Sequence, residues 1–360
     1  MPKGSRLPSV LTIFAFGMVV LPLASMVDPL RSFLDWVLWF LSTDLFLKLV
    51  VFPGVLFVSG YVIITVWGER KLLARVMLRI GPLHVGRYAG SLQVIADFLK
   101  LVFKEIIIPR KAHKWMFLSM PVLGSMVFML PLALIPFAEN WVVYSHPLSL
   151  LFVFAIISMG PMIILLTGWS QNNKYSFIGG LREAFQMIAY EIPLILSAIS
   201  VVVLSRSLDL MEIVKSQSSY WYALALPIGF LVFFISGMAE TARSPFDIPE
   251  AEQEIVIGWM TEYSGIVYGL CYMLLYEKLL IFALLTSLLF LGGWYGPFLP
   301  LPQIGWVLLK VALITITFIV IRGAYPRFRL DQLLRIGWKV LIPLAVLNLL
   351  LAVTLAGGIL

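Results

Sequence analysis

The stretch "GIVYGLCYMLLYEKLLIFALLTSLLFL" (residues 265–291) decides the fold class. It is long and apolar, and it is interrupted by one adjacent pair of charges, Glu277 and Lys278. About 20 apolar residues are enough for a helix to cross the hydrocarbon core of a bilayer. A charge at that depth is costly unless it is paired or hydrated. Neighbouring residues of a helix point in different directions, so each of the two charges is expected to find a partner on another helix.

The composition of the whole chain is that of a membrane protein. Of its 360 residues, 61% are hydrophobic and only 12% are charged, whereas a soluble domain carries about 25% charged residues. Lipid offers backbone groups no hydrogen-bond partner, so the predicted fold class is all-α, a polytopic transmembrane helical bundle. The single cysteine, Cys271, excludes a disulfide framework and a cysteine-based iron–sulfur or zinc site within this chain. The three histidines are far apart in sequence, which argues against a metal cluster.

Nine stretches are apolar enough to span a membrane, and no linker or internal repeat divides them. They cover residues 7–27, 46–67, 115–137, 148–169, 184–204, 221–240, 265–291, 304–322 and 336–357. The first follows a basic start and resembles a signal peptide, but its apolar run is longer than usual for one, so we interpret it as a retained helix. About nine spans in one domain are therefore expected.

The distribution of basic residues predicts the orientation of the chain. The segment 68–114 carries ten of the 26 bases, namely Arg70, Lys71, Arg75, Arg79, Arg87, Lys100, Lys104, Arg110, Lys111 and Lys114. Later basic residues gather in alternate loops, and residues 138–147 and 292–303 contain none. By the positive-inside rule, the N-terminus and the large basic loop are cytoplasmic and the C-terminus is outside. The net charge of +7 is then a topology signal and does not indicate nucleic-acid binding.

One part of the basic loop is predicted to form an amphipathic helix. In "SLQVIADFLKLVFKE" (residues 91–105), Gln93, Asp97, Lys100 and Lys104 share one face, and apolar residues form the other. This pattern favours a helix lying in the membrane interface. An ordinary helix packed on a soluble partner is the alternative.

Two glutamates stand out at membrane depth. Glu69, in "WGERK", ends the predicted span 46–67, where a plain ion cluster at the interface is an alternative to a functional site. Glu191, in "IAYEIPL", lies about two turns inside the predicted span 184–204. A solvated face cannot explain Glu191, so a proton site facing the bundle is favoured.

The stretch "AETARSPFDIPEAEQEIVIGWMTEYSG" (residues 239–265), called the acidic loop below, concentrates carboxylates beside lipid. It holds six of the 19 acids, Glu240, Asp247, Glu250, Glu252, Glu254 and Glu262, and one base, Arg243. Pro245 and Pro249 predict irregular backbone followed by a helix from about Glu250, with Asp247 near its N-cap. Stabilisation of that helix end by acids is one interpretation. Because crowded carboxylates raise one another's pKa values, a water-filled, proton-exchanging funnel is the favoured one.

Five stretches together resemble one family, the membrane subunit 1 (the H subunit) of respiratory complex I, NADH:quinone oxidoreductase. They are "GERKLLAR" (68–75), "RIGPLHVGRYAGSLQVIADFLKLVFKE" (79–105), "NNKYSFIGGLREAFQMIAYEI" (172–192), the acidic loop and "RLDQLLRIGWKVLIPL" (329–344). The resemblance covers residues 46–360, which it implies to be a membrane domain of eight core spans like that of the family. Residues 1–45 then form an N-terminal extension with an extra helix.

The resemblance implies a subunit of an inner (plasma) membrane translocase that binds no redox cofactor itself. Quinone would be the substrate, and a neighbouring hydrophilic-arm subunit would carry the terminal iron–sulfur cluster. Other partners would be membrane-arm subunits, antiporter-like ones included, and lipid. The implied acidic path for protons consists of Glu191, Glu240, Asp247, Glu250, Glu252, Glu254 and Glu262. The implied quinone chamber is lined by Glu69, Arg70, Lys71, Arg75, Asp97, Glu105 and Arg243, with Arg243 balancing the carboxylates of the acidic loop.

Several positions depart from the usual pattern of that family, including Leu83, His84, Ala242, Ile106 and Met260. They indicate a divergent member, archaeal or thermophilic, and leave the electron donor and the quinone open. The equivalent subunit of a deazaflavin-dependent, methanophenazine-reducing dehydrogenase or of a ferredoxin-dependent one is an alternative. A membrane-bound hydrogenase is disfavoured by the intact "PFDIPEAE". A free-standing ion transporter is disfavoured by the missing inverted repeat.

Overall fold

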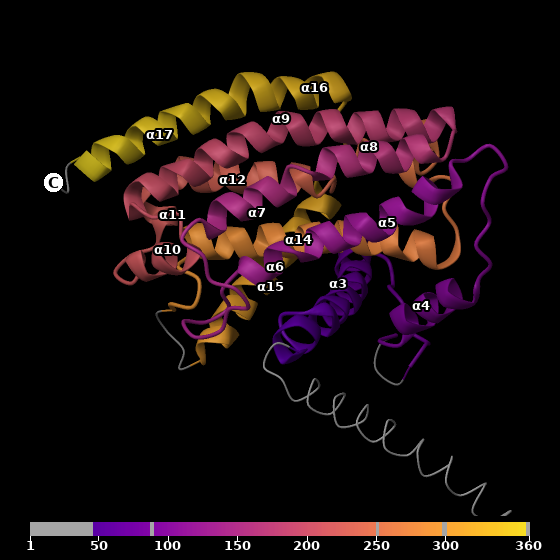
Figure 1. The fold of residues 1–360 in the computed structure, drawn as a ribbon, viewed down its shortest axis with the longest axis horizontal. Coiled ribbons are helices and arrows are strands. Elements are labelled where there is room, and N and C mark those ends of the chain that lie inside the picture. Colours follow the sequence, from indigo (N-terminus) through magenta and orange to yellow (C-terminus); the bar gives the residue numbers. More distant parts are fainter. Residues whose placement is uncertain (1–45, 87–89, 250–251, 297–300, 358–360) are drawn as a thin grey trace, which may run out of the picture.

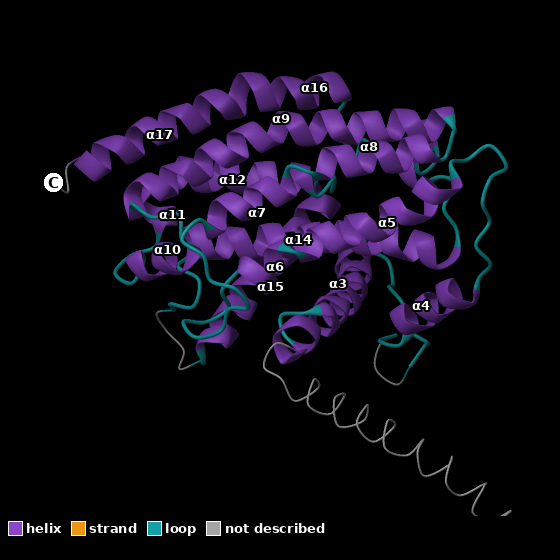
Figure 2. Ribbon diagram, viewed as in Figure 1, coloured by secondary structure: helices purple, strands orange, loops and turns teal. Residues whose placement is uncertain are grey.

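The computed structural model describes residues 46–86, 90–249, 252–296 and 301–357, and they form a bundle of helices joined by loops (Figure 2). In chain order the helices are η1 (Leu47–Val51), α3 (Val55–Val76), α4 (Gln93–Phe103), α5 (Lys114–Met129), α6 (Pro131–Leu134), α7 (Ser149–Ile157), α8 (Gly160–Ser170), α9 (Lys174–Ser205), α10 (Leu210–Ser216), α11 (Tyr222–Ala225), α12 (Pro227–Glu240), α13 (Glu252–Ile255), η2 (Gly258–Met260), α14 (Gly265–Phe290), α15 (Gln303–Ala324), α16 (Leu330–Ile336), η3 (Gly337–Leu341) and α17 (Ile342–Gly357). The expected all-α class is confirmed.

Two long helices organise the bundle (Figure 1). The helix α9 packs against α8, α12 and α17, and α14 packs against α5, α12 and α15. Asn173 caps the N-terminus of α9, because its side-chain oxygen accepts a hydrogen bond from the backbone N–H of Tyr175 (3.0 Å). The helix ends at Arg206, which has left-handed backbone angles.

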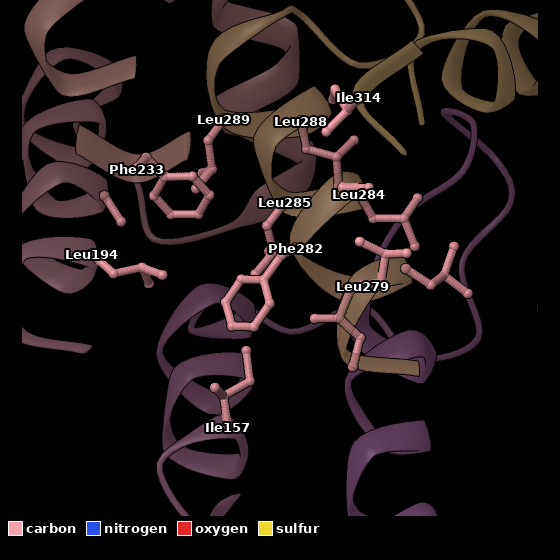
Figure 3. Packing of buried hydrophobic residues seen from close by; sticks show 14 of the residues in the cluster. Ile157, Leu194, Phe233, Leu279, Phe282, Leu284, Leu285, Leu288, Leu289 and Ile314 are labelled. Carbon is pink, nitrogen blue, oxygen red and sulfur yellow. The ribbon is translucent and has the colours of Figure 1, made fainter. Parts of the chain in front are cut away.

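The helix α14 forms the centre of the core. Figure 3 shows its side chains from Leu279 to Leu289 meeting Ile157 of α7, Leu194 of α9, Phe233 of α12 and Ile314 of α15. Of its most apolar 18-residue window, 94% is buried among the other helices. Lipid tails are as apolar as leucine, so this packing is stabilised mainly by van der Waals contact and by hydrogen bonds between helices.

The predicted spans largely correspond to observed helices. Seven helical segments of the described chain are long and apolar enough to cross a membrane, namely Leu47–Val76, Lys114–Leu134, Ser149–Ser170, Lys174–Ser205, Gly265–Phe290, Gln303–Ala324 and Leu330–Gly357. The predicted span 221–240 is divided into α11 and the 14-residue α12, because Pro227 starts a new helix. The predicted span 7–27 and the extension 1–45 lie outside the described residues.

Two predicted helix boundaries are wrong for the same reason. The helix α3 continues to Val76 and not to residue 67, and α9 begins at Lys174 and not at residue 184. Glu69 therefore lies within α3, about two turns before its end, and Glu191 lies near the middle of α9. In both cases the charged residues that suggested a boundary belong to the helix.

The predicted amphipathic helix is present as α4. Its polar residues Gln93 and Asp97 are linked by a hydrogen bond of 3.0 Å, and Asp97 also contacts α3. Its apolar residues Phe98, Leu99 and Phe103 are exposed. A helix lying in the membrane interface is expected to expose such an apolar face, which would contact the lipid.

Candidate functional site

Glu69 is the centre of a buried charge cluster that joins the helices α3, α14 and α15 to the acidic loop. It is 4% exposed, and its carboxylate accepts hydrogen bonds from Arg243 at 2.6 and 2.7 Å. Arg322 of α15 binds the same carboxylate, and the Tyr276 hydroxyl of α14 donates to it at 2.8 Å. The guanidinium of Arg243 also lies over the Tyr276 ring, 4.3 Å from its centroid. Two arginines share one carboxylate, so the cluster of Glu69, Arg243 and Arg322 has a net charge of +1.

A partly open cavity adjoins this cluster. Its volume is about 30 Å³, and it is lined by Thr241, Ala242, Arg243, Tyr272, Leu275, Tyr276 and Arg322. The hydroxyls of Tyr272 and Tyr276 are 3.1 Å apart, so one donates to the other. The lining thus combines positive charge and hydroxyl groups with one leucine.

The other residues predicted for the chamber lie closer to the surface. Arg70 and Asp97 form an ion pair of 2.5 Å between α3 and α4, with both side chains more than one-third exposed. Lys71 lies half-buried on α3, and Arg75, one turn further on, is exposed. Glu105 is exposed after α4, and its backbone carbonyl accepts a hydrogen bond from the Ser264 hydroxyl at 3.3 Å.

The first half of the acidic loop is buried and irregular, as expected from its prolines. Asp247 is 3% exposed and accepts hydrogen bonds from Arg327 at 2.9 Å and from the Ser244 hydroxyl at 3.3 Å. The predicted N-cap role of Asp247 is wrong, because the next helix, α13, begins only at Glu252. Burial raises the pKa of Asp247 above its usual value, and the charge of Arg327 opposes this shift.

The described acids in the second half of the acidic loop, Glu254 and Glu262, lie nearer the surface than Asp247. Glu254 has a side chain that is 62% exposed and is paired with Arg182 of α9 at 2.6 Å. Glu262 accepts a hydrogen bond of 2.6 Å from the side chain of Asn173. Glu250 lies outside the described residues, and of Glu252 only the backbone, at the start of α13, is described.

Glu191 and Glu240 differ in their surroundings. Glu191 is half-buried on α9, and the Ser158 hydroxyl between α7 and α8 donates to its carboxylate. Glu240 ends α12, is 2% exposed, and neither of its carboxyl oxygens has a hydrogen-bond partner in the described chain. The charges that act on Glu240 are those of Lys278, Glu191 and Glu183.

The expected separate partners of Glu277 and Lys278 are confirmed. Glu277 accepts a hydrogen bond of 2.7 Å from Ser125 of α5, and Lys278 donates to Glu183 of α9 at 3.0 Å. Glu183 itself was not among the predicted site residues.

Arg322 and Arg327 were also missing from the predicted site. Arg327 lies in one of the later basic loops, which served only to predict the topology, and Arg322 is the last residue of the predicted span 304–322. Arg243 likewise differs from expectation, because it is paired with Glu69 of α3 rather than with an acid of its own loop. In sequence, the opposite charges of these pairs lie too far apart to suggest that they meet.

The arrangement brings part of the predicted residues into two connected groups. One is the Glu69 cluster with its cavity, and the other is the acidic loop with Glu191 and Glu240. Arg243 connects the groups, because it belongs to the acidic loop and binds Glu69. Within the described residues, no three His, Cys, Asp or Glu side chains gather in a way that could hold a metal ion.

A multi-pass helical bundle with charges paired between its helices is typical of membrane proteins whose ionisable residues serve a function. The sequence profile described as NADH dehydrogenase matches residues 47–353. The chain belongs to this NADH dehydrogenase family.

Similar proteins carry a consistent name. The chain is 41% identical to the H subunit of the NADH-quinone oxidoreductase of Magnetococcus marinus, over 87% of this chain and 91% of that protein. It is 42% identical to an H subunit of the same enzyme from Syntrophobacter fumaroxidans, over 88% and 96%. It is 44% identical to the H subunit from Bacillus cytotoxicus, over 82% and 89%. The resemblance inferred from the five sequence stretches is thereby confirmed, and these relatives are bacterial.

Proposed function

We propose that this chain is a membrane subunit of a proton-translocating NADH:quinone oxidoreductase, where it shapes the quinone chamber and carries an acidic path for protons. The observation that supports the chamber best is the Glu69 cluster beside its cavity. The names of the relatives favour NADH and quinone over deazaflavin, ferredoxin or methanophenazine. We place the protein in the cell's inner membrane, bound to hydrophilic-arm subunits that carry iron–sulfur clusters and to further membrane-arm subunits.

The charge of the cluster suits a quinone that is being reduced. A quinone headgroup gains negative charge when it accepts electrons, and a fixed positive charge stabilises that state more than the oxidised one. Arg243 and Arg322 provide one positive charge in excess of Glu69. Arg243 is 6% exposed, so little water screens its charge.

The acidic path would begin where the chamber ends. Asp247 shares the field of Arg322 with Glu69, which links its protonation to the charge state of the cluster. Glu240 and Glu191 continue toward the interior of the bundle. Glu250, Glu252, Glu254 and Glu262 would exchange protons with water at the mouth of the path. Glu69, Arg70, Lys71, Arg75, Asp97, Glu105 and Arg243 would line the chamber and its approach beside α4.

Two substitutions in the purified complex test this proposal. Arg243→Ala removes a charge-assisted contact, so NADH:quinone reductase activity should fall about tenfold to a hundredfold while NADH oxidation by an artificial acceptor survives. Glu191→Gln should strongly reduce proton pumping in reconstituted vesicles and also quinone reduction.

A matched control is available at the other end of the bundle. Glu139 lies in the loop after α6 and forms an exposed ion pair of 3.1 Å with Lys215. Glu139→Gln should leave both activities unchanged. Full pumping by Glu191→Gln would refute the acidic path, and equal loss of both activities in Arg243→Ala would point to failed assembly.

A further inference from the structure

The ion pair between Lys278 and Glu183 is the most deeply buried one in the described part of the chain. Both side chains have zero exposure, and the Nζ–Oε1 distance is 3.0 Å. The ammonium also lies 3.6 Å from the sulfur of Met187 and 5.3 Å from the centroid of the Phe128 ring. These last two contacts are weak compared with a hydrogen bond to oxygen.

The pair is poorly satisfied for a purely structural element. An ammonium has three hydrogens to donate, and here a single oxygen, Oε1 of Glu183, accepts from it in the described chain. The second carboxylate oxygen of Glu183 has no partner there. A buried ion pair adds stability only when its geometry is good and its remaining donors and acceptors are bonded. Apolar residues of similar volume would serve the fold as well or better.

Lys310 shows what a structural buried lysine looks like in this protein. Its ammonium donates to three backbone carbonyls, those of Leu291, Gly293 and Tyr295, at 2.6, 2.7 and 2.6 Å. All three donors are used, and they satisfy the end of α14 and the turn after it. Lys278 therefore differs from Lys310, because not all of its N–H donors have an oxygen acceptor in the described chain.

The group that can use this capacity is Glu240. Its carboxyl is buried, and neither of its oxygens is bonded within the described chain. Glu240 lies beside the turn of α9 that holds Glu183, because Gln186, three residues after Glu183, donates to the backbone carbonyl of Ala239 at 2.7 Å. Lys278 is the cation whose charge acts on Glu240. Further polar atoms without partners there belong to Gln186 of α9 and to Ser236 of α12, one turn before Glu240. Buried polar atoms of this kind are normally bonded to one another or to ordered water. Lys278 thus lies within a polar region shared by α9, α12 and α14.

We propose that Lys278 is a positioning residue of the proton path, a mobile countercharge that Glu183 and Glu240 share. This inference rests on the proposed function, because it presumes that Glu240 transfers protons. While Glu240 is protonated, Lys278 stays bound to Glu183, as observed. When the O–H bond of Glu240 breaks and its proton passes through water to Glu191, the carboxylate left behind accepts a hydrogen bond from Lys278. The ammonium keeps its three hydrogens throughout and returns to Glu183 when Glu240 is protonated again.

The charged groups around this event come from each of the three helices. Glu183 and Glu191 belong to α9, Glu240 to α12, and Lys278 and Glu277 to α14. One oxygen of Glu277 accepts from Ser125 of α5, and its second oxygen has no partner in the described chain. Glu277 directly precedes Lys278 on α14, so the two side chains point in different directions and Glu277 is not a partner of the ammonium. The countercharge is therefore exchanged between Glu183 and Glu240.

Double variants of the purified complex test the proposal. Glu183→Gln with Lys278→Gln, and separately Glu183→Ala with Lys278→Met, remove both charges together and leave no unpaired charge behind. Proton pumping per NADH oxidised is measured in vesicles, with Glu240→Gln as reference. We expect the assembled double variants to lose about tenfold or more in pumping, as Glu240→Gln does, since both lack a charge-assisted contact of the path.

Two single variants separate positioning from structure. Lys278→Arg keeps the countercharge and should retain a large part of the pumping. Lys310→Met should lower the thermal stability of the complex while pumping per complex stays as in the unmodified protein.

Each remaining outcome is decisive. Normal pumping by a double variant overturns the proposal and leaves the acidic path intact if Glu240→Gln is impaired. Normal pumping by Glu240→Gln overturns both this proposal and the proposed acidic path. If neither double variant assembles, the pair serves folding and the proposal is also overturned.

Discussion

The Glu69 cluster predicts an asymmetry between two substitutions that remove the same ion pair. Glu69→Gln leaves two arginines facing each other, with Arg243 and Arg322 side chains only 7% and 29% exposed. Breaking a buried pair in this way costs about 3–5 kcal/mol, because the remaining charge is uncompensated. Arg243→Met instead leaves Glu69 bound to Arg322 and to Tyr276. Its loss is limited to the hydrogen bonds of one guanidinium, about 1–3 kcal/mol.

The difference can be measured in the assembled complex. About 2 kcal/mol between the two variants corresponds to a shift of about 3 °C in apparent Tm for a chain of this length. We expect Glu69→Gln to give less assembled complex on native gels and the lower Tm in detergent. The double variant that combines Glu69→Gln with Arg243→Met should recover part of the loss because one positive charge has gone. If Arg243→Met is as damaging as Glu69→Gln, the charge count of +1 is not what governs the cluster.

Three further predictions concern the acidic loop. Glu254→Gln should change the Tm of the complex little, since its exposed pair with Arg182 contributes at most about 1 kcal/mol; a loss as large as that of Glu69→Gln would contradict this. Gly179→Ala should destabilise by about 1–3 kcal/mol, because the new Cβ would lie 2.6 Å from the Cα of Gly258; an unchanged Tm would show that the two backbones separate freely. Burial raises the pKa of Asp247 above its usual 3.8, so the folded state binds the proton of this carboxyl more tightly than the unfolded state does. The contribution of Asp247 to the free energy of unfolding is therefore present below pH 3.8 and is lost as the pH rises through the raised pKa. In Asp247→Asn that fall in Tm should be absent, and an identical pH dependence in both proteins would refute this account.

The helical architecture was predictable because a membrane span is a local property of the sequence. Each long apolar run, such as residues 265–291, must satisfy its own backbone and so becomes a helix. The ends of α3 and α9 were not predictable in this way. Glu69 and Arg182 looked like the edges of spans, but their partners are supplied by residues distant in the chain.

The candidate site was predictable in composition and not in pairing. The clustered acids and the resemblance pointed to Glu69, Glu240 and Arg243, but not to Arg322, Tyr272 or Tyr276. The partner of Arg243 is separated from it by 174 residues, and Arg322 lies 253 residues from Glu69. Hydropathy and spacing describe neighbours along a helix, so contacts of this range need the tertiary structure.

The central position of α14 has a consequence for how the protein is made. A span that carries Glu277 and Lys278 is a poor substrate for insertion by itself, since each charge disfavours transfer into lipid. The two residues that receive these charges, Ser125 and Glu183, belong to α5 and α9, which leave the ribosome earlier. Synthesis therefore delivers these two partners before the charges that they pair with. A chain in which α14 preceded α5 and α9 would have the same contacts when folded. During synthesis, however, its lysine and glutamate would be unpaired in the bilayer until α5 and α9 had been inserted.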